Sequence, residues 1–343
     1  MKLHAVRELL RAAGARPRHE KLALRAWSRG LSLDHYAHRS DWRFPKSLDS
    51  ALPALSDTLA RLATRVSAHD GADGSSRWLL RLDDGQTVES VLLLRDGVCV
   101  SSQVGCAVGC LFCMTGREGL IRHLTSGEIV AQVALARAAR PGIRRVVFMG
   151  MGEPAHNIEN VMEAIELLGT EGALGHKNLV FSTVGDQRVF ERLPQGPVKP
   201  ALALSLHTMK PDLRRRLLPK APRLDPAELI ELGERYARST GYPIQYQWTL
   251  LEGINDGDDE LASISSLLAG KYAVMNFIPY NTVDDLPYRR PSWERAQSMT
   301  RWLGERGVLA KVRMSAGQDV EGGCGQLRAR ATGGRGGAQV VTS

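Results

Sequence analysis

One stretch of the sequence joins a short β-rich run to a glycine-punctuated loop: Val98-Cys-Val-Ser-Ser-Gln-Val-Gly-Cys-Ala-Val-Gly-Cys-Leu-Phe-Cys-Met-Thr-Gly116. The loop carries Cys106, Cys110 and Cys113 in the spacing C-x3-C-x2-C. Three thiolates on one short loop can hold three irons of a 4Fe-4S cluster and leave the fourth iron without a protein ligand. Such an iron can chelate the amino and carboxylate groups of S-adenosylmethionine (SAM) and pass an electron to its sulfonium. The spacing therefore predicts a 4Fe-4S cluster and SAM as cofactors.

A structural zinc site is the alternative interpretation of these cysteines. Zinc in such a site binds four ligands, commonly as two C-x2-C pairs or as one C-x2-C with two distant histidines. The sequence has one short cysteine cluster, although Cys99 or Cys324 could supply a fourth thiolate. The spacing therefore favours the iron–sulfur cluster over zinc.

Length and composition are those of a globular protein. With 343 residues, 43% of them hydrophobic and 24% charged, the chain can form one barrel-sized core of roughly 200 to 250 residues and a smaller accessory domain. No run approaches the roughly 18 apolar residues of a membrane span, and the N-terminus lacks the apolar core of a secretory signal. We therefore expect a cytoplasmic monomer without membrane contact.

The charge balance is basic. The chain has 45 Lys and Arg against 37 Asp and Glu, a formal net charge of +8. Such an excess attracts polyanions and favours a nucleic acid as partner, although charge alone does not specify one. There are five cysteines, three of them clustered, so a disulfide framework is not expected, and reduced thiols fit an iron–sulfur site.

From Val98 onward, short β-rich runs alternate with helical stretches, which is the pattern of βα units around parallel strands. The predicted strands lie near residues 98–102, 144–149, 178–182, 200–205, 243–250, 272–278 and 308–314. Thr125-Ser-Gly-Glu128 predicts a capping box at the start of one helix between them. The sequence thus predicts an α/β fold with an incomplete TIM-like (βα)6 barrel over residues 96–330.

Residues 1–95 follow a different pattern and are predicted to form a small α+β accessory region that contacts RNA. Helices are expected at the start and near residues 50–66, and a loop over residues 68–76. A hairpin is expected from Arg77 to Leu92, because Asp84-Gly85 is a tight-turn dipeptide between two alternating runs. The glycine-rich tail at 331–343 is predicted to be disordered.

In βα barrels, the loops at the carboxyl ends of the strands build the active site. Here Gly150-Met-Gly-Glu-Pro154 follows the second predicted strand, and later strands lead to Ser182, Ser205-Leu-His207 and Asn281. Glu153 could accept hydrogen bonds from a cofactor's ammonium group or lie on a solvated turn, and its place on the rim favours the former. The serines and Asn281 can bind ribose hydroxyls or a carboxylate, whereas His207 alone is more typical of a structural histidine.

These signals, in this order, closely resemble the RlmN/Cfr family of radical SAM RNA methyltransferases. The resemblance spans about residues 87–327 and rests on several segments together. The matching segments are Cys99-Val-Ser-Ser-Gln-Val-Gly-Cys106, Cys110 to Cys113, Met149-Gly-Met-Gly-Glu-Pro154, Ser205-Leu-His207, Gly253-Ile-Asn-Asp256 and Cys324-Gly-Gln-Leu327.

The resemblance implies a role for each candidate residue. It places the cluster on Cys106, Cys110 and Cys113, and it places SAM on Gly152, Glu153, Ser182, Ser205, Leu206, His207 and Asn281. It makes Cys324 the thiol that becomes S-methylated. Cys99 is then its resolving partner in a transient disulfide, and Glu89 is the proton acceptor.

The implied substrate is an adenosine in ribosomal RNA, with tRNA as the alternative. The amidine carbons C2 and C8 of adenine are electrophilic, so they cannot attack the methyl group of SAM, and a radical carrier is needed. In the implied reaction, Cys324 takes a methyl group from one SAM, a second SAM generates a radical on that methyl carbon, and addition to the base leaves a covalent protein–RNA adduct. The implied electron donor is a protein such as flavodoxin.

Two other functions are compatible with some of these sequence features. A radical SAM enzyme acting on a small molecule or peptide would have a purely structural Cys324 and no dependence on RNA. A zinc-containing RNA-binding protein would bind no SAM and would be colourless.

Overall fold

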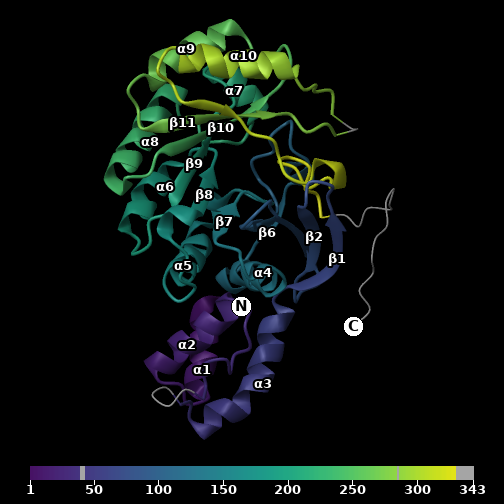
Figure 1. The fold of residues 1–343 in the computed structure, drawn as a ribbon, viewed down its shortest axis with the longest axis vertical. Coiled ribbons are helices and arrows are strands. Elements are labelled where there is room, and N and C mark those ends of the chain that lie inside the picture. Colours follow the sequence, from purple (N-terminus) through teal and green to yellow (C-terminus); the bar gives the residue numbers. More distant parts are fainter. Residues whose placement is uncertain (39–42, 284–285, 330–343) are drawn as a thin grey trace.

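The computed structural model describes residues 1–38, 43–283 and 286–329, and over these ranges its main sheet has ten strands (Figure 1). The strand order is β1-β2-β3-β4-β7-β8-β9-β10-β11-β12. The bounds are β1 (Thr64–Asp70), β2 (Ser76–Arg81), β3 (Thr87–Leu92), β4 (Gly97–Cys99), β7 (Arg145–Phe148), β8 (Leu179–Thr183), β9 (Ala201–Ser205), β10 (Ile244–Leu250), β11 (Ala273–Pro279) and β12 (Ala310–Val312). A small separate sheet pairs β5 (Gln103–Gly105) with β6 (Leu120–His123).

From β4 to β12, neighbouring strands of the main sheet are parallel. The connections carry α4 (Ser126–Ala139), α5 (Ile158–Gly169), α6 (Gln187–Arg192), α7 (Pro211–Leu217), α8 (Pro226–Thr240), α9 (Asp258–Leu268) and α10 (Trp293–Gly304). Six strand–helix units followed by a last strand confirm the predicted incomplete barrel, and each predicted parallel strand is present. The sequences of these strands are largely apolar because both faces of the sheet are buried: helices cover one face, and the other faces the barrel interior.

The predicted hairpin is also present, as β2 and β3 with Gly85 in the left-handed region at a φ of 84°. β3 pairs antiparallel with β4 through Val91 opposite Cys99, so the accessory hairpin and the barrel share one continuous sheet. The predicted domain boundary between residues 95 and 96 therefore lies within that sheet. The predicted disordered tail, 331–343, lies outside the described residues.

Three helices, α1 (Leu3–Ala12), α2 (Pro17–Ser28) and α3 (Lys46–Arg61), lie beneath the barrel and pack against α4 (Figure 1). The expected second helix ends earlier than predicted, and β1 replaces its end and part of the expected loop. β1 was not predicted because it is a largely exposed edge strand, whose residues do not alternate regularly between apolar and polar. The predicted Thr125–Glu128 capping box is present and begins α4.

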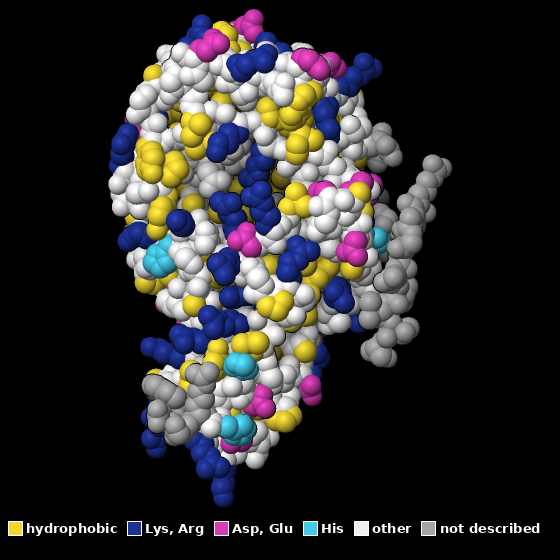
Figure 2. Space-filling view, viewed as in Figure 1, with side chains coloured by type: hydrophobic (Ala, Val, Ile, Leu, Met, Phe, Trp, Pro, Cys, Tyr) yellow, Lys and Arg dark blue, Asp and Glu magenta, His cyan; other side chains and the backbone are white. Residues whose placement is uncertain are grey.

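The hydrophobic core is continuous from these helices into the barrel, from Leu3 and Leu48 to Trp248 and Phe277. Among the described residues, there is no helix with the length and apolar character needed to cross a membrane. Lys and Arg side chains gather around a hollow on one face of the barrel, and again where the barrel meets the N-terminal helices (Figure 2).

Candidate active site

A cavity of about 160 Å³ lies at the carboxyl ends of the parallel strands, as expected for a βα barrel. We call it the cofactor cavity. Most of the predicted site residues line it, namely Cys106, Cys110, Cys113, Gly152, Glu153, Ser182, Ser205, His207 and Cys324.

Backbone hydrogen bonds and a required glycine hold the cysteine loop in its conformation. The loop leaves β5 at Gly105, where φ is 77° and an added Cβ would lie 2.0 Å from the Gly119 carbonyl oxygen. Glycine is therefore required for the loop to turn back along β6. The Cys106 N–H donates to that Gly119 oxygen at 2.9 Å, and the Cys113 N–H donates to the Cys110 carbonyl at 3.0 Å.

The electrostatics of the three cysteines fit a metal cluster. Burial raises the pKa of Cys106 to about 12, and it also raises the pKa values of Cys110 and Cys113. Repulsion between neighbouring thiolates adds to this effect. Without a cation, all three groups would therefore be neutral thiols at pH 7. A coordinating metal deprotonates thiols, so this donor set suits a cluster of irons.

Backbone amides complete the surroundings of two of these sulfurs. Val108 and Gly109 donate hydrogen bonds to Cys106, and Thr115 and Gly116 donate to Cys113. Such hydrogen bonds tune the potential of an iron–sulfur cluster. Within the described residues, no three His, Cys, Asp or Glu side chains converge as ligands of a single metal ion would.

Glu153 presents a buried carboxylate to the cofactor cavity. Its two oxygens accept hydrogen bonds from the N–H groups of Ala155 at 3.1 Å and Val184 at 3.0 Å, and burial raises its pKa to about 7. At Gly152 φ is 103°, and a Cβ would lie 2.6 Å from the Cβ of Gln103, so only glycine fits. A cationic ammonium group in the cavity would favour the ionised form of Glu153.

Ser182 near the end of β8 is paired with Ala203, two residues before Ser205 at the end of the adjacent β9, and both serines line the same cavity. His207 has a φ of 64°, and its Nδ1 accepts a hydrogen bond from the Thr249 N–H at 3.0 Å. Its ring meets Phe112 of the cysteine loop edge to face at 4.8 Å. Burial lowers the pKa of His207 to about 3, so the ring is neutral and fixed in place.

Two other predicted cofactor residues lie outside the lining of the cofactor cavity. Leu206 is fully buried in the hydrophobic core. Asn281 is buried behind Cys324, and its Nδ2 donates to the Cys324 carbonyl at 2.9 Å and to Ser315 Oγ at 2.9 Å. In this structure, Asn281 therefore positions the segment that carries Cys324.

The cysteine loop also holds the Cys324 segment. The Met114 N–H donates to the Gly325 carbonyl and Thr115 Oγ1 donates to the Leu327 carbonyl, both at 2.7 Å. Two segments more than 200 residues apart in sequence are thereby joined next to the cluster cysteines. This arrangement places the Cys324 side chain, which is exposed, at the wall of the cofactor cavity.

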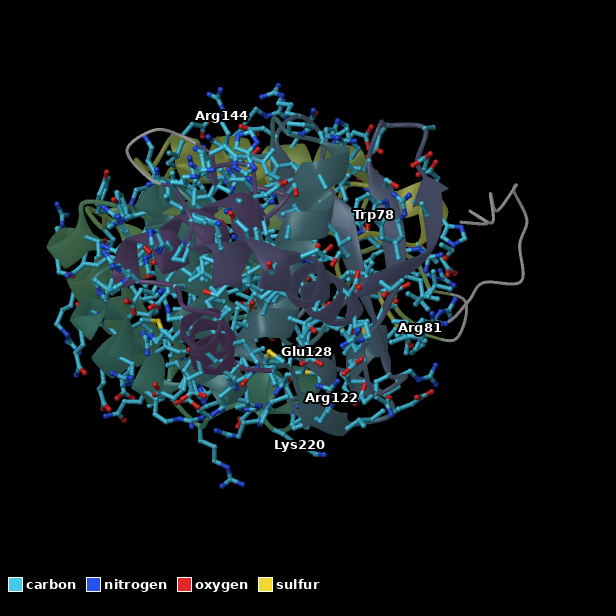
Figure 3. The ribbon with its side chains drawn as sticks, turned by 90° about the horizontal axis from the view of Figure 1, so that it is seen from below. Trp78, Arg81, Arg122, Glu128, Arg144 and Lys220 are labelled. Atoms are coloured by element: carbon cyan, nitrogen blue, oxygen red, sulfur yellow. The ribbon has the colours of Figure 1, made fainter. Side chains whose placement is uncertain are left out.

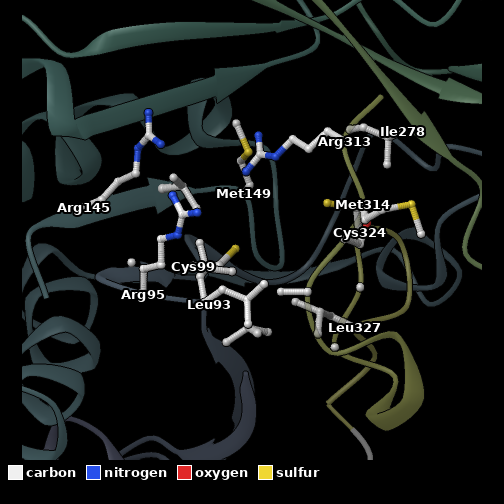
Figure 4. Close-up of a pocket in the computed structure, with 18 of the residues that line it drawn as sticks. Leu93, Arg95, Cys99, Arg145, Met149, Ile278, Arg313, Met314, Cys324 and Leu327 are labelled. Carbon is white, nitrogen blue, oxygen red and sulfur yellow. The ribbon is translucent and has the colours of Figure 1, made fainter. Parts of the chain in front are cut away.

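A second cavity, of about 290 Å³, meets the cofactor cavity at Cys324 (Figure 4). We call it the arginine cavity, because Arg95, Arg145 and Arg313 line it. Cys99 lines it too, so Cys99 and Cys324 face one cavity. Burial raises the pKa of Cys99 to about 12, and Cys324 adds a smaller contribution in the same direction.

Glu89 is fully buried and lines neither cavity. One carboxylate oxygen pairs with the Arg77 guanidinium, and the other accepts the N–H groups of Arg328 at 2.8 Å and Ala329 at 3.1 Å. Glu89 thus anchors the chain just beyond Cys324 to the hairpin. Acceptance of a substrate proton by Glu89 would require this anchor to open.

Sequence reasoning missed the arginines around the site. Arg214 on α7 is buried and donates to the carbonyl oxygens of Val184 and Ser205, and burial lowers its pKa to about 10. It fastens α7 beneath the carboxyl ends of β8 and β9. The one available signal for Arg145 was a charged residue in alternation with Val147 and Met149 on a strand that was otherwise apolar.

The fold and the cysteine loop define a radical SAM enzyme. The family model described as the Radical SAM superfamily matches residues 100–263. A crystal structure of a radical SAM methyltransferase from Sphaerobacter thermophilus superposes with a TM-score of 0.83 at 37% identity, covering 96% of this chain and 98% of that one.

Curated relatives match over nearly the whole chain. A protein of Aromatoleum aromaticum named "Probable RNA methyltransferase" is 68% identical, covering 96% of this chain and 93% of its own length. A protein of Methylibium petroleiphilum with the same description is 67% identical, covering 97% of this chain and 94% of its own length. This chain belongs to their family of radical SAM methyltransferases. The family implies SAM and an iron–sulfur cluster as cofactors, so the zinc-protein interpretation is wrong.

Proposed function

We propose that this enzyme methylates an amidine carbon, C2 or C8, of an adenosine in RNA, with Cys324 as the carrier of the methyl carbon. Ribosomal RNA is the first candidate substrate and tRNA the alternative. The naming of these relatives as probable RNA methyltransferases and the net charge of +8 support an RNA substrate.

The position of Cys324 carries the proposal. It lies in the wall between the cofactor cavity and the arginine cavity, with the cluster cysteines on one side and Cys99 on the other. A side chain that accepts a group from one cavity and delivers it to the other must lie at such a boundary. A purely structural cysteine has no reason to be exposed there.

The cluster, held by Cys106, Cys110 and Cys113, and SAM would together supply the electron and the radical chemistry of the reaction. Glu153 would bind the ammonium group of SAM, and Ser182 and Ser205 its hydroxyls. Apolar side chains in the lining, such as Val108, Phe112 and Phe148, would shield part of the reactive centre from water.

Cys99 performs the release step in this proposal. Before that step, Glu89 would accept the proton that the base loses, and the adduct would lose its unpaired electron to the cluster, so that the adduct is closed-shell before release. The Cys99 thiol then gives up its proton, and its sulfur attacks the Cys324 sulfur, so that the S–S bond forms and the S–C bond to the adduct breaks. The electron pair of the S–C bond stays on the departing carbon, which takes up a proton and becomes the methyl group. An external reductant, such as flavodoxin or a thiol, then restores both cysteines.

Nucleoside mass spectrometry tests the proposed function directly. RNA from cells that lack this protein should lose a methyladenosine in which the methyl group is on carbon, and re-expression of the wild type should restore it. The Cys324→Ala variant should restore less than about 1% of the modification, because no other thiol lies at the boundary between the cavities. Separation of ribosomal RNA from tRNA before digestion identifies the substrate. Unchanged nucleosides in every RNA class would contradict the proposal.

A further inference from the structure

The arginine cavity meets the cofactor cavity at four residues that line both, Met149, Ile278, Arg313 and Cys324. The two cavities therefore approach the same thiol from different sides. The cofactor cavity is lined by the three cysteines of the loop and by most of the residues predicted to bind SAM. The arginine cavity contains none of these residues, so its own occupant remains to be identified.

Strand geometry explains how the arginine cavity is built. Arg145, Val147 and Met149 alternate along β7 and just beyond it, so they share one face of the strand. Gly97 and Cys99 share the corresponding face of β4, where Gly97 is opposite Arg145 and Cys99 opposite Val147. The cavity thus runs along the inner face of the sheet, from the amino ends of β4 and β7 toward Cys324 at their carboxyl ends.

The arginine cavity carries an excess of positive charge. None of the guanidinium groups of Arg95, Arg145 and Arg313 has a hydrogen bond or ion pair with any part of the chain that the structure describes, and Arg95 and Arg145 are exposed while Arg313 is half-buried. One acidic residue, Asp96, also lines the cavity, and its charge acts on Arg145 in the favourable direction. Burial, and next to it the charge of Arg313, lowers the pKa of Arg145, so these two guanidinium groups repel each other. A bound anion would relieve that repulsion.

The wall between the arginines and Cys324 is largely apolar. Leu93, Met149, Ile278 and Leu327 line it. Figure 4 shows Leu93 and Met149 between the two arginines Arg95 and Arg145 on one side and Cys324 on the other, and it shows Ile278 and Leu327 near Cys324. Flat apolar surface suits a nucleobase, whereas planar guanidinium groups suit phosphate. The volume of about 290 Å³ is near the lower end of the range for ligand pockets and suits a single nucleotide.

We propose that the arginine cavity takes up the target nucleotide of the RNA, which reaches Cys324 from the side opposite the cofactors. The base packs against the apolar wall, and the phosphates on its two sides bind Arg95 with Arg145 at one end and Arg313 at the other. Guanidinium groups at both ends fit a nucleotide within a strand, which has a phosphate on each side. The assignment of RNA rests on the proposed function.

Binding of a 5′-phosphorylated, fluorescein-labelled oligoadenylate of eight nucleotides tests the cavity. The Arg145→Ala variant is expected to raise the Kd about tenfold and to reduce the slope of log Kd against log salt by about 0.7, because one phosphate contact of a single strand is lost. Arg95→Ala is expected to change the Kd and the salt slope by similar amounts. Arg144→Ala is the matched control, since Arg144 is exposed like Arg145 and carries the same charge, but its side chain does not line the cavity (Figure 3).

Arg144→Ala should change the Kd less than twofold if the contact is specific to the cavity. Unchanged binding in both Arg145→Ala and Arg95→Ala would overturn the proposal. An equal loss in Arg144→Ala and Arg145→Ala would also overturn it, because the effect would then be that of a general positive surface.

Two assays test the proposed function separately from the cavity. One measures the methylation of Cys324 by SAM without RNA, and the other measures methyl transfer to extracted RNA. If the wild type does neither, yet the binding difference between Arg145→Ala and Arg144→Ala persists, the proposed function fails and the cavity assignment stands. If the wild type methylates RNA while Arg145→Ala and Arg95→Ala bind the oligoadenylate like the wild type, the cavity assignment alone fails.

Discussion

The Cys99→Ala variant is expected to accumulate as a covalent protein–RNA adduct through Cys324. Cys99 and Cys324 line one cavity, where Cys99 is buried and Cys324 is exposed. Once the carbon on Cys324 has bonded to the base, only attack by a neighbouring thiol on the Cys324 sulfur releases the product. Without that thiol, product formation should fall at least about 100-fold, whereas formation of the adduct continues.

The adduct is measured as a band of reduced mobility that nuclease treatment returns to the position of the free protein. The double variant with Cys99→Ala and Cys324→Ala is the control, and it should form no such band, because the attachment point is absent. Normal turnover of Cys99→Ala would contradict the resolving role. Loss of iron from this variant would also contradict the resolving role, because it would show that Cys99 is needed for the structure of the site.

Replacement of any one of Cys106, Cys110 and Cys113 by alanine is expected to abolish the cluster and all SAM cleavage. In the proposed site these three thiolates are the full set of protein ligands, and a cluster that lacks one of them is not retained. We expect iron and sulfide to fall below about one tenth of the wild-type content, and the broad absorbance to disappear.

The Cys324→Ala variant is the matched control for the three ligand variants, because it removes a thiol from the same cavity without removing a ligand. It should retain full iron content after anaerobic reconstitution. Wild-type iron and sulfide content in all three ligand variants would contradict the assignment of the cluster.

The barrel was predictable because its signals are local in the sequence. Buried parallel strands read as short apolar runs, as in Ala201 to Leu204, and the helix starts have caps such as Thr125 to Glu128. β1 was missed because an exposed edge strand has no apolar alternation. The pairing of the hairpin with the barrel through β3 and β4 depends on contacts that no local pattern encodes.

The cysteine loop and the glycine–glutamate turn were predictable because each is a short contiguous motif. The arginine cavity was not, because Arg95, Arg145 and Arg313 come from three separate segments that only the sheet brings together. The burial of Glu89 under the Cys324 segment also depends on tertiary structure. The glycine at 323 also has a tertiary cause, since a Cβ there would lie 2.7 Å from Asn281 Nδ2.

The methylation state of Cys324 tests the central claim most directly. Peptide mass spectrometry across Val320 to Arg328, on protein incubated with SAM in the absence of RNA, should show a methyl group on the Cys324 sulfur. The same peptide from a cluster-ligand variant such as Cys113→Ala serves as a comparison for whether this step depends on the cluster. A Cys324 that stays unmodified in the reconstituted wild type would contradict its role as the methyl carrier, and it would favour a radical SAM enzyme whose Cys324 is structural.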